Sequence, residues 1–184
     1  MVRKLKHHEQ KLLKKVDFFD WKQDQGHRDG EVMRRYHVQD REDYHKYNKI
    51  CGEIRKLARQ LSLLAPQDPI RVKHEQLLLE KLYTMGIING KSKVSQLENS
   101  VTVAAMCRRR IGVVMQRLKM AETIADAVKF IEQGHVRVGT DVITDPAFLV
   151  TRDMEDYLTW SNGSKIRRNI ASFKNKVDDF DLDD

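Results

Sequence analysis

Residues 107–160 read CRRRIGVVMQRLKMAETIADAVKFIEQGHVRVGTDVITDPAFLVTRDMEDYLTW, and their patterns decide the fold. Apolar residues recur at three- and four-residue steps from just before this stretch to residue 118. This spacing predicts a helix over residues 102–118. Thr102 suits its start, because a threonine hydroxyl accepts a hydrogen bond from a free backbone N–H. The apolar stripe of this helix consists of Val103, Cys107, Ile111, Val114 and Leu118.

A basic face lies opposite this stripe. At about 100° per residue, Arg109 and Gln116 point away from the apolar side. Arg108, Arg110 and Arg117 flank that direction. We therefore expect the three consecutive arginines to face outward and to offer their charges to a ligand.

The next segment predicts a second, shorter helix. Thr123 with Asp126 three residues later imitates a capping box, and Gly134 suits the left-handed position that often follows a helix. Lys129 and Gln133 face outward on this helix. Its buried side is expected to consist of Ile124, Ala127, Val128 and Ile131.

The period then changes from that of a helix to that of a strand. Residues 135–138 alternate polar and apolar side chains, residues 139–141 have turn chemistry, and residues 142–143 resume an extended run. Asp145-Pro146 predicts another turn, and residues 157–160 predict a closing strand. Two helices and a small curled sheet are therefore expected to form one unit.

Ahead of this unit the sequence predicts further helices. The clearest covers residues 41–64, and a second covers residues 71–85 and ends at Gly86. Prolines between the two favour a helical hairpin. Residues 1–20 carry apolar side chains at helical spacing among lysines, and residues 21–30 are polar and predict a loop.

The apolar stripe of residues 41–64 is too long for so small a core to cover. We expect part of it to contact another protein. The stripe consists of Tyr47, Ile50, Ile54, Leu57, Leu61 and Leu64.

The composition narrows the choice of partner. The 184 residues carry a net charge of +7 and a pI of about 9.4, so an anionic polymer is the natural partner, although the charge alone also fits a membrane surface. The sequence has no apolar run of roughly 18 residues, so no membrane-spanning helix is expected.

Cys51 and Cys107 fall on apolar stripes and are expected to be buried free thiols.

Catalytic and metal-binding motifs are not found. The sequence contains no Walker loop, dinucleotide fingerprint or nucleophile elbow. His7 and His8 beside Glu9 lack the spacing of a zinc site. We expect neither enzyme activity nor a cofactor nor a bound metal.

Several features in register resemble the alpha-L RNA-binding motif of the ribosomal protein S4 family. They are the arginine triplet, the run Gly134-His135-Val136-Arg137-Val138 and the pair Asp145-Pro146. The resemblance implies an α+β protein in which a mainly helical N-terminal region precedes a small alpha-L domain of two helices and a short curled β-sheet. We expect the helical region over residues 1–99, the alpha-L domain over residues 100–160 and a C-terminal extension with an acidic tail over residues 161–184.

The same resemblance implies an RNA surface on the first helix of the motif and on the turn after the second. Duplex RNA hides its base edges, so a protein surface that binds it offers cations to phosphates. Basic residues at 165–168 would extend this surface. The aspartate-rich end suits a basic protein partner or stays disordered. The RNA-binding residues implied are Arg108, Arg109, Arg110, Arg117, Lys119, Lys129, His135 and Arg137.

The whole chain also resembles a short nucleolar branch of the S4 family, through residues 1–13, residues 41–44 and residues 178–181. This resemblance implies a non-catalytic factor of the small-subunit processome that promotes pairing of the U3 small nucleolar RNA with precursor ribosomal RNA in the nucleolus. It also implies two protein partners, an M-phase phosphoprotein scaffold and a Brix-domain protein. A structural protein of the mature small ribosomal subunit would use the same motif, and composition does not separate the two functions.

Overall fold

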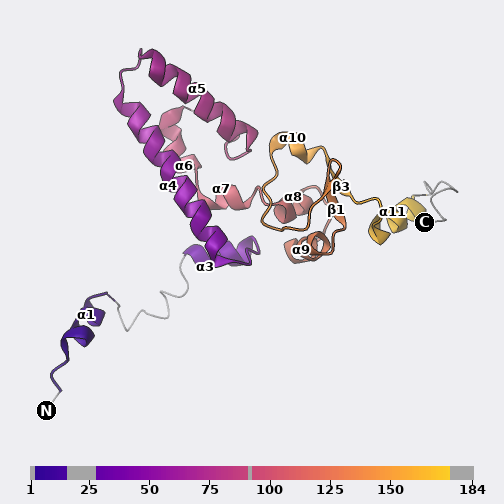
Figure 1. Ribbon diagram of the computed structural model, residues 1–184, viewed down its shortest axis with the longest axis horizontal. Helices are drawn as coiled ribbons and strands as arrows, with labels where there is room; N and C mark the ends of the chain where they lie inside the picture. Colours follow the sequence, from indigo (N-terminus) through magenta and orange to yellow (C-terminus); the bar gives the residue numbers. More distant parts are fainter. Residues whose placement is uncertain (1–2, 16–27, 91–92, 175–184) are drawn as a thin grey trace.

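The computed structural model describes residues 3–15, 28–90 and 93–174, and it places a group of helices ahead of a small sheet (Figure 1). The sheet has three antiparallel strands in the order β2-β1-β3, so the predicted α+β class is confirmed. The helices are α1 (His7–Lys15), α3 (Arg28–Arg35), α4 (Arg41–Leu63), α5 (Pro69–Thr84), the 3-10 turn η1 (Val94–Gln96), α6 (Leu97–Ser100), α7 (Val103–Cys107), α8 (Ile111–Arg117), α9 (Ile124–Glu132), α10 (Arg152–Glu155) and α11 (Lys165–Phe173); the strands are β1 (Val136–Val138), β2 (Asp141–Val142) and β3 (Leu158–Trp160).

Three sequence predictions fall wholly or partly on residues that lie outside the described ranges. These are the helical spacing over residues 1–20, of which α1 is described, the loop over residues 21–30, of which residues 28–30 are described, and the acidic tail, which lies outside entirely. None of the helices in the described parts of the chain has the length and apolar character needed to cross a membrane.

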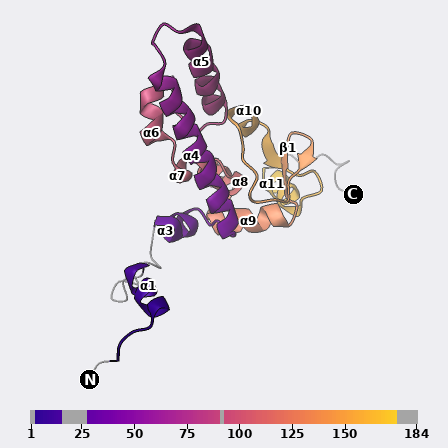
Figure 2. The same ribbon diagram turned by 60° about the vertical axis from the view of Figure 1, so that its left-hand side comes forward.

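The predicted helical hairpin is confirmed by α4 and α5, which lie side by side (Figures 1 and 2). The Asp68 side chain caps α5 by accepting a hydrogen bond from the backbone N–H of Ile70 at 2.9 Å, and Pro69 occupies the first turn. Gly86 follows α5 with φ of 73°, the left-handed conformation that glycine adopts without steric cost. Figure 2 shows the end of α5 next to α10.

The loop predicted over residues 21–30 is wrong from Arg28 onward, because α3 begins there. Acidic residues in the first turn of α3 and arginines in its last turn both favour the helix dipole. Val32 and Met33 pack against the helical core, so tertiary contacts outweigh the glycine that favoured a loop.

A first hydrophobic core lies among α3, α4, α5, α6 and α7. Its most deeply buried members are Cys51, Leu97, Val101, Met106 and Cys107. Both cysteines are free and buried, as predicted. Burial raises the pKa of the Cys107 thiol to about 11, so this thiol stays protonated at neutral pH.

The single helix predicted over residues 102–118 is wrong, because the chain forms α7 and α8 with a break between them. Thr102 does cap α7, accepting a hydrogen bond from Ala105 N at 3.2 Å. At the break, Arg110 is extended, with φ of −62° and ψ of 140°. The backbone there pairs with a distant segment instead of continuing the helix: Ile111 N donates to Phe148 O at 2.9 Å, and Val150 N donates to Arg109 O at 2.8 Å.

A second hydrophobic core lies beyond the break, among α8, α9 and the sheet. It includes six fully buried residues, Ile111, Val114, Met115, Ala127, Ile131 and Val136, each 0% exposed. Thr123 caps α9 by accepting a hydrogen bond from Asp126 N at 3.1 Å, as predicted. Gly134 has φ of 72°, which confirms its predicted left-handed position. The predicted turn at Asp145-Pro146 is also present, with Asp145 Oδ1 accepting from Ala147 N at 2.8 Å.

We predict that Gly86→Ala destabilises the protein by about 1–3 kcal/mol, because an alanine there combines a strained backbone with a close contact. Its Cβ would lie 2.7 Å from Cζ of Arg109. Gly52→Ala in α4 is the control, since a Cβ at Gly52 meets nothing within 4 Å. It should stabilise the helix by about 0.5–1 kcal/mol. Urea unfolding of both variants measures the difference, and a stable Gly86→Ala would contradict this packing.

Candidate nucleic-acid interface

Arg109 is buried, with 4% of its surface exposed, and its guanidinium is fully engaged. Its Nε and Nη2 donate to Val150 O at 2.9 and 2.6 Å, and Nη1 donates to the Glu155 carboxylate. The planar group also packs against Gly86. Arg109 therefore connects the end of α5 with the segment that runs into α10.

Arg110 is equally buried, at 3% exposed, and points to α4. Its Nη1 donates to Asp43 Oδ2 at 3.1 Å and to the Tyr47 hydroxyl at 3.0 Å. That hydroxyl donates onward to Ala147 O at 3.4 Å. Burial raises the pKa of Tyr47 despite the nearby Arg110 charge, so the phenol keeps the proton that it donates.

A third arginine also connects the two cores. Arg152 at the start of α10 donates from Nε to Tyr83 O and from Nη2 to Ile88 O, both at 2.8 Å. Its guanidinium also lies 4.4 Å from the centre of the Tyr83 ring, a cation–π contact. We call Arg109, Arg110 and Arg152 the arginine junction.

The prediction that Arg109 and Arg110 face outward is therefore wrong. It assumed one straight helix, whereas the break between α7 and α8 turns both side chains inward. Buried guanidinium groups need carboxylates and carbonyls as partners, and these partners come from segments far away in the sequence. Arg108, the remaining member of the triplet, is exposed at the end of α7.

Glu155 joins the arginine junction to the surface. Its Oε2 lies 2.6 Å from Nη2 of Arg117, and its other oxygen accepts from Arg109. Partial burial would raise the pKa of the Glu155 carboxyl, but the hydrogen bonds and charges of Arg109 and Arg117 outweigh this effect and lower the pKa below its ordinary value. Arg117, with half of its side chain exposed, is thereby oriented at the surface.

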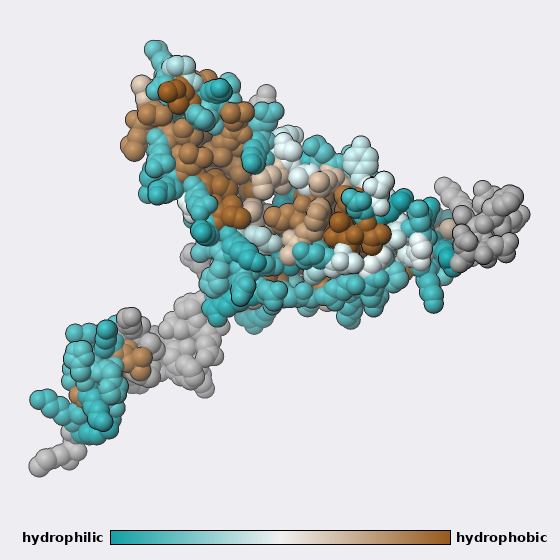
Figure 3. Space-filling view, in the orientation of Figure 1, coloured by the Kyte–Doolittle hydropathy of each residue, from teal (hydrophilic) through white to brown (hydrophobic). Residues whose placement is uncertain are grey.

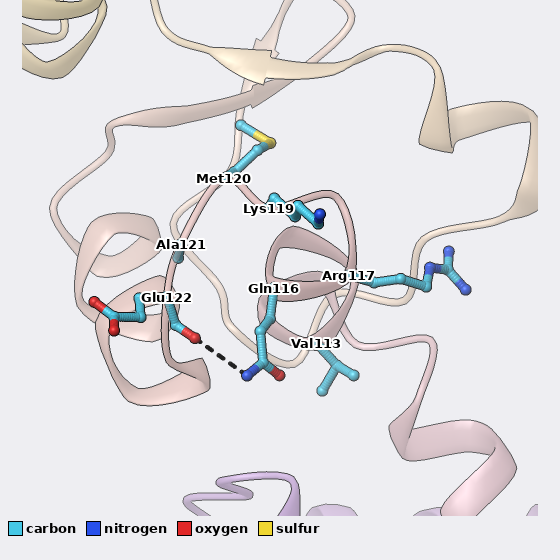
Figure 4. Close-up of a pocket in the computed structure, with 7 residues that line it drawn as sticks. All are labelled: Val113, Gln116, Arg117, Lys119, Met120, Ala121 and Glu122. Carbon is cyan, nitrogen blue, oxygen red and sulfur yellow. Dashed lines mark hydrogen bonds between the residues drawn. The ribbon is translucent and has the colours of Figure 1, made fainter.

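The turn from α8 to α9 places a second cation beside Arg117. Lys119 is exposed and has φ of 58°, an uncommon conformation for a residue with a side chain. Figure 4 shows that Arg117 extends from the end of α8 and Lys119 from the turn that follows. Both line an open hollow with a volume of about 580 Å³. Gln116 crosses this hollow and donates to Glu122 O at 3.2 Å. The hollow is lined by Val113, Gln116, Arg117, Lys119, Met120, Ala121 and Glu122.

The remaining predicted residues lie on α9 and the sheet. Lys129 is exposed on α9, 3.7 Å from Asp126. Arg137 projects from the outer face of β1 and donates to Thr159 Oγ1 of the neighbouring strand at 3.1 Å. His135 Nδ1 lies 3.1 Å from the hydroxyl of Ser164, which caps α11 and thereby brings the basic α11 next to the sheet.

The structure thus divides the eight predicted residues into two classes. Six of them reach the surface at least in part, and Arg109 and Arg110 do not. The carboxylates of Asp43 and Glu155, which orient the arginines, were not predicted. Sequence reasoning had no local signal for them, because they lie 67 and 46 residues from their partners.

Comparisons with known proteins agree with this architecture. Residues 4–108 match the ribosomal protein S4/S9 N-terminal domain, and residues 109–156 match the S4 domain. The protein is therefore of the S4 class. The first domain match ends at residue 108 and the second begins at residue 109, so the boundary between the two domains lies within the arginine triplet.

Full-length relatives define the family more narrowly. The U3 small nucleolar ribonucleoprotein protein IMP3 of Saccharomyces cerevisiae is 71% identical over 182 residues, which cover 99% of this chain and 100% of the relative. The human protein of the same name is 50% identical, with both chains covered in full. The small ribosomal subunit protein uS4 of Picrophilus torridus is a distant relative, 26% identical over 78% of this chain and 79% of its own. The chain belongs to the IMP3 family of S4-domain proteins.

The lowered pKa of Glu155 predicts a specific dependence of stability on pH. A carboxyl whose pKa is lower in the folded state contributes stability above its unfolded pKa, and this contribution is lost as the pH falls through the folded pKa. Glu155→Gln should therefore cost about 1.5–3 kcal/mol at pH 7, and much less at pH 3. Urea unfolding of both proteins at the two pH values tests this. An equal loss of stability at both pH values would show that the negative charge of Glu155 does not stabilise the folded protein.

Proposed function

We propose that this protein is a non-catalytic RNA-binding assembly factor that belongs to the U3 small nucleolar ribonucleoprotein and promotes pairing of the U3 RNA with precursor ribosomal RNA. The full-length identity to proteins named for that particle carries the proposal. Its work would belong to maturation of small-subunit ribosomal RNA in the nucleolus, within the small-subunit processome. The chemistry needs no bond making or breaking.

The surface proposed to bind RNA consists of the exposed cations of the S4 unit. Two RNA strands repel each other through their phosphates, and a protein that neutralises phosphates releases counterions and lowers this repulsion. The guanidinium groups of arginines and the ammonium groups of lysines, held on a rigid fold, supply the positive charges that neutralise the phosphates. The residues proposed to contact RNA are Arg108, Arg117, Lys119, Lys129, His135 and Arg137.

Arg109 and Arg110 receive a different role in this proposal. Their guanidinium groups position the S4 unit against the helical core and do not contact RNA themselves. They affect RNA binding only through the placement of α8 and of Arg117, which shares Glu155 with Arg109.

We further propose that different segments of the chain have different functions. Residues 100–160 act as the RNA-binding domain, residues 1–99 act as a helical region that meets proteins, and residues 161–184 act as an extension. The protein partners proposed are the M-phase phosphoprotein scaffold and the Brix-domain protein of the same particle. The basic helix α11 would extend the RNA surface beyond the sheet.

The salt dependence of RNA affinity tests this surface. In the variant with Arg108→Gln, Lys119→Gln and Arg137→Gln, the log–log slope of affinity against salt should fall by about 2–3, since each lost phosphate contact removes roughly 0.7–0.9. The control is Lys73→Gln, an exposed cation on α5, which should leave the slope unchanged. A triple variant that is folded and has the original slope would refute the assigned surface.

A strand-pairing assay tests the finer function. The protein should accelerate annealing of a U3 RNA fragment to a complementary precursor fragment, and the triple variant should lose most of that acceleration at equal concentration. The Lys73→Gln protein serves again as the matched control. Tight binding without any acceleration would limit the protein to a scaffolding role.

The uS4 relatives favour a second candidate, a structural protein of the mature small subunit. Sedimentation of cell extracts separates the two. An assembly factor travels with large precursor particles and is missing from translating ribosomes, whereas a structural protein travels with both.

A further inference from the structure

An apolar face of the α4–α5 hairpin remains uncovered. Figure 3 shows hydrophobic surface running along these two helices on the side toward the viewer. Ile50 and Leu57 on α4 and Leu64 just after its end are spaced seven residues apart and are each at least 38% exposed. On α5, Ile70 and Leu77 repeat at the same interval and are 60% and 53% exposed.

This face borders the core side of α4. The core side of α4 is made by Tyr47, Cys51, Ala58 and Leu61, all buried. At about 100° per residue, Leu57 lies about 100° around the helix from Ala58 and about 40° from Leu61, so the exposed row lies beside the buried one. The sequence stripe predicted for this helix thus divides into a covered half and an uncovered half. Five exposed large aliphatic side chains on one helical hairpin exceed what scattered surface residues usually explain.

Lysines surround the apolar face. Lys46, Lys49 and Lys56 lie beside the α4 row, and Lys73 and Lys81 lie beside the α5 row, all of them exposed. The acidic residues among them are Glu53 and Glu80. A partner that covers the face therefore meets an excess of positive charge at its edge.

We propose that this face, formed by Ile50, Leu57, Leu64, Ile70 and Leu77, binds an amphipathic helix of another protein whose polar side is acidic. A third helix can pack along two antiparallel helices with its ridges in their grooves. The α4 row is about 20 Å long, which corresponds to roughly four turns of the partner helix. Acidic residues on that helix would pair with the lysine edge.

Two other occupants fit less well. RNA offers phosphates and ribose to such a face, and aliphatic side chains have no aromatic surface on which bases can stack. A second copy of this chain, related by a two-fold axis, would set the same lysines against one another. The inference does not depend on the proposed RNA function, because none of its residues belongs to the proposed RNA surface.

Photo-crosslinking in cells tests the proposal. Benzoylphenylalanine replaces Leu57 or Leu77 in the full chain, and the crosslinked peptide is sequenced by mass spectrometry. The expected product is a protein segment with apolar residues at three- and four-residue steps and more Asp and Glu than Lys and Arg. Leu63 is the control position, an exposed leucine about 120° around α4 from Leu57. Crosslinks to RNA, to a second copy of the chain or to a basic segment would overturn the proposal, as would a yield no higher than at Leu63.

Negative charges introduced on the face give an independent readout. Leu57→Glu with Leu77→Glu should reduce the co-purified amount of the crosslinked protein at least tenfold, whereas Leu63→Glu should retain it. RNA affinity of the double variant should stay within twofold of the original, which separates loss of this interface from unfolding or from a failure of the RNA function. Full retention of the partner by the double variant would also overturn the proposal.

Discussion

The guanidinium of Arg109 joins the two halves of the molecule. A buried charge is costly unless its hydrogen-bonding groups are satisfied, and Arg109 meets this requirement with the carbonyl of Val150 and the carboxylate of Glu155. Gly86 leaves the space in which the planar group packs. The end of the α4–α5 hairpin and the segment before α10 are thereby placed against the break between α7 and α8. Arg110 connects to α4 in the same way, through a hydrogen bond to Asp43, and Arg152 connects to the end of α5, through hydrogen bonds to backbone carbonyls.

This constraint determines which cations are available to a ligand. Two of the three consecutive arginines are buried, so the cations that reach the surface in this part of the chain are Arg108, those at the turn after α8 and Arg137 on the outer face of the sheet. Glu155 connects the buried arginines to the surface, because it binds the buried Arg109 with one oxygen and the half-exposed Arg117 with the other. The fold of the junction and the orientation of a surface arginine thus depend on one carboxylate. The helical hairpin, at the other end of the first core, presents an apolar surface instead of a charged one.

Local patterns predicted much of the fold. Thr102, Thr123 and Gly134 occupy the cap positions that their residue types favour, and the helix predicted over residues 41–64 is present as α4, Arg41–Leu63. The break at Arg110 was not predictable from helical periodicity, because the backbone there pairs with residues 148–150 and the side chain bonds to Asp43. Helix periodicity assigned Arg109 to the polar face, and only contacts made at long sequence separation reverse that assignment. The exposure of most of the basic residues was thus predictable from the sequence, but the burial of Arg109 and Arg110 was not.

Charge-preserving substitutions test the role of the arginine junction most directly. Lysine keeps the positive charge that a phosphate contact needs, but it lacks the planar fork with which Arg109 bonds to both Val150 and Glu155. Urea unfolding should show that Arg109→Lys costs about 1.5–3 kcal/mol, the range for hydrogen bonds to charged groups. Arg108→Lys should change stability by less than about 0.5 kcal/mol, as surface substitutions do. Equal stability of the two variants would contradict the structural role assigned to Arg109.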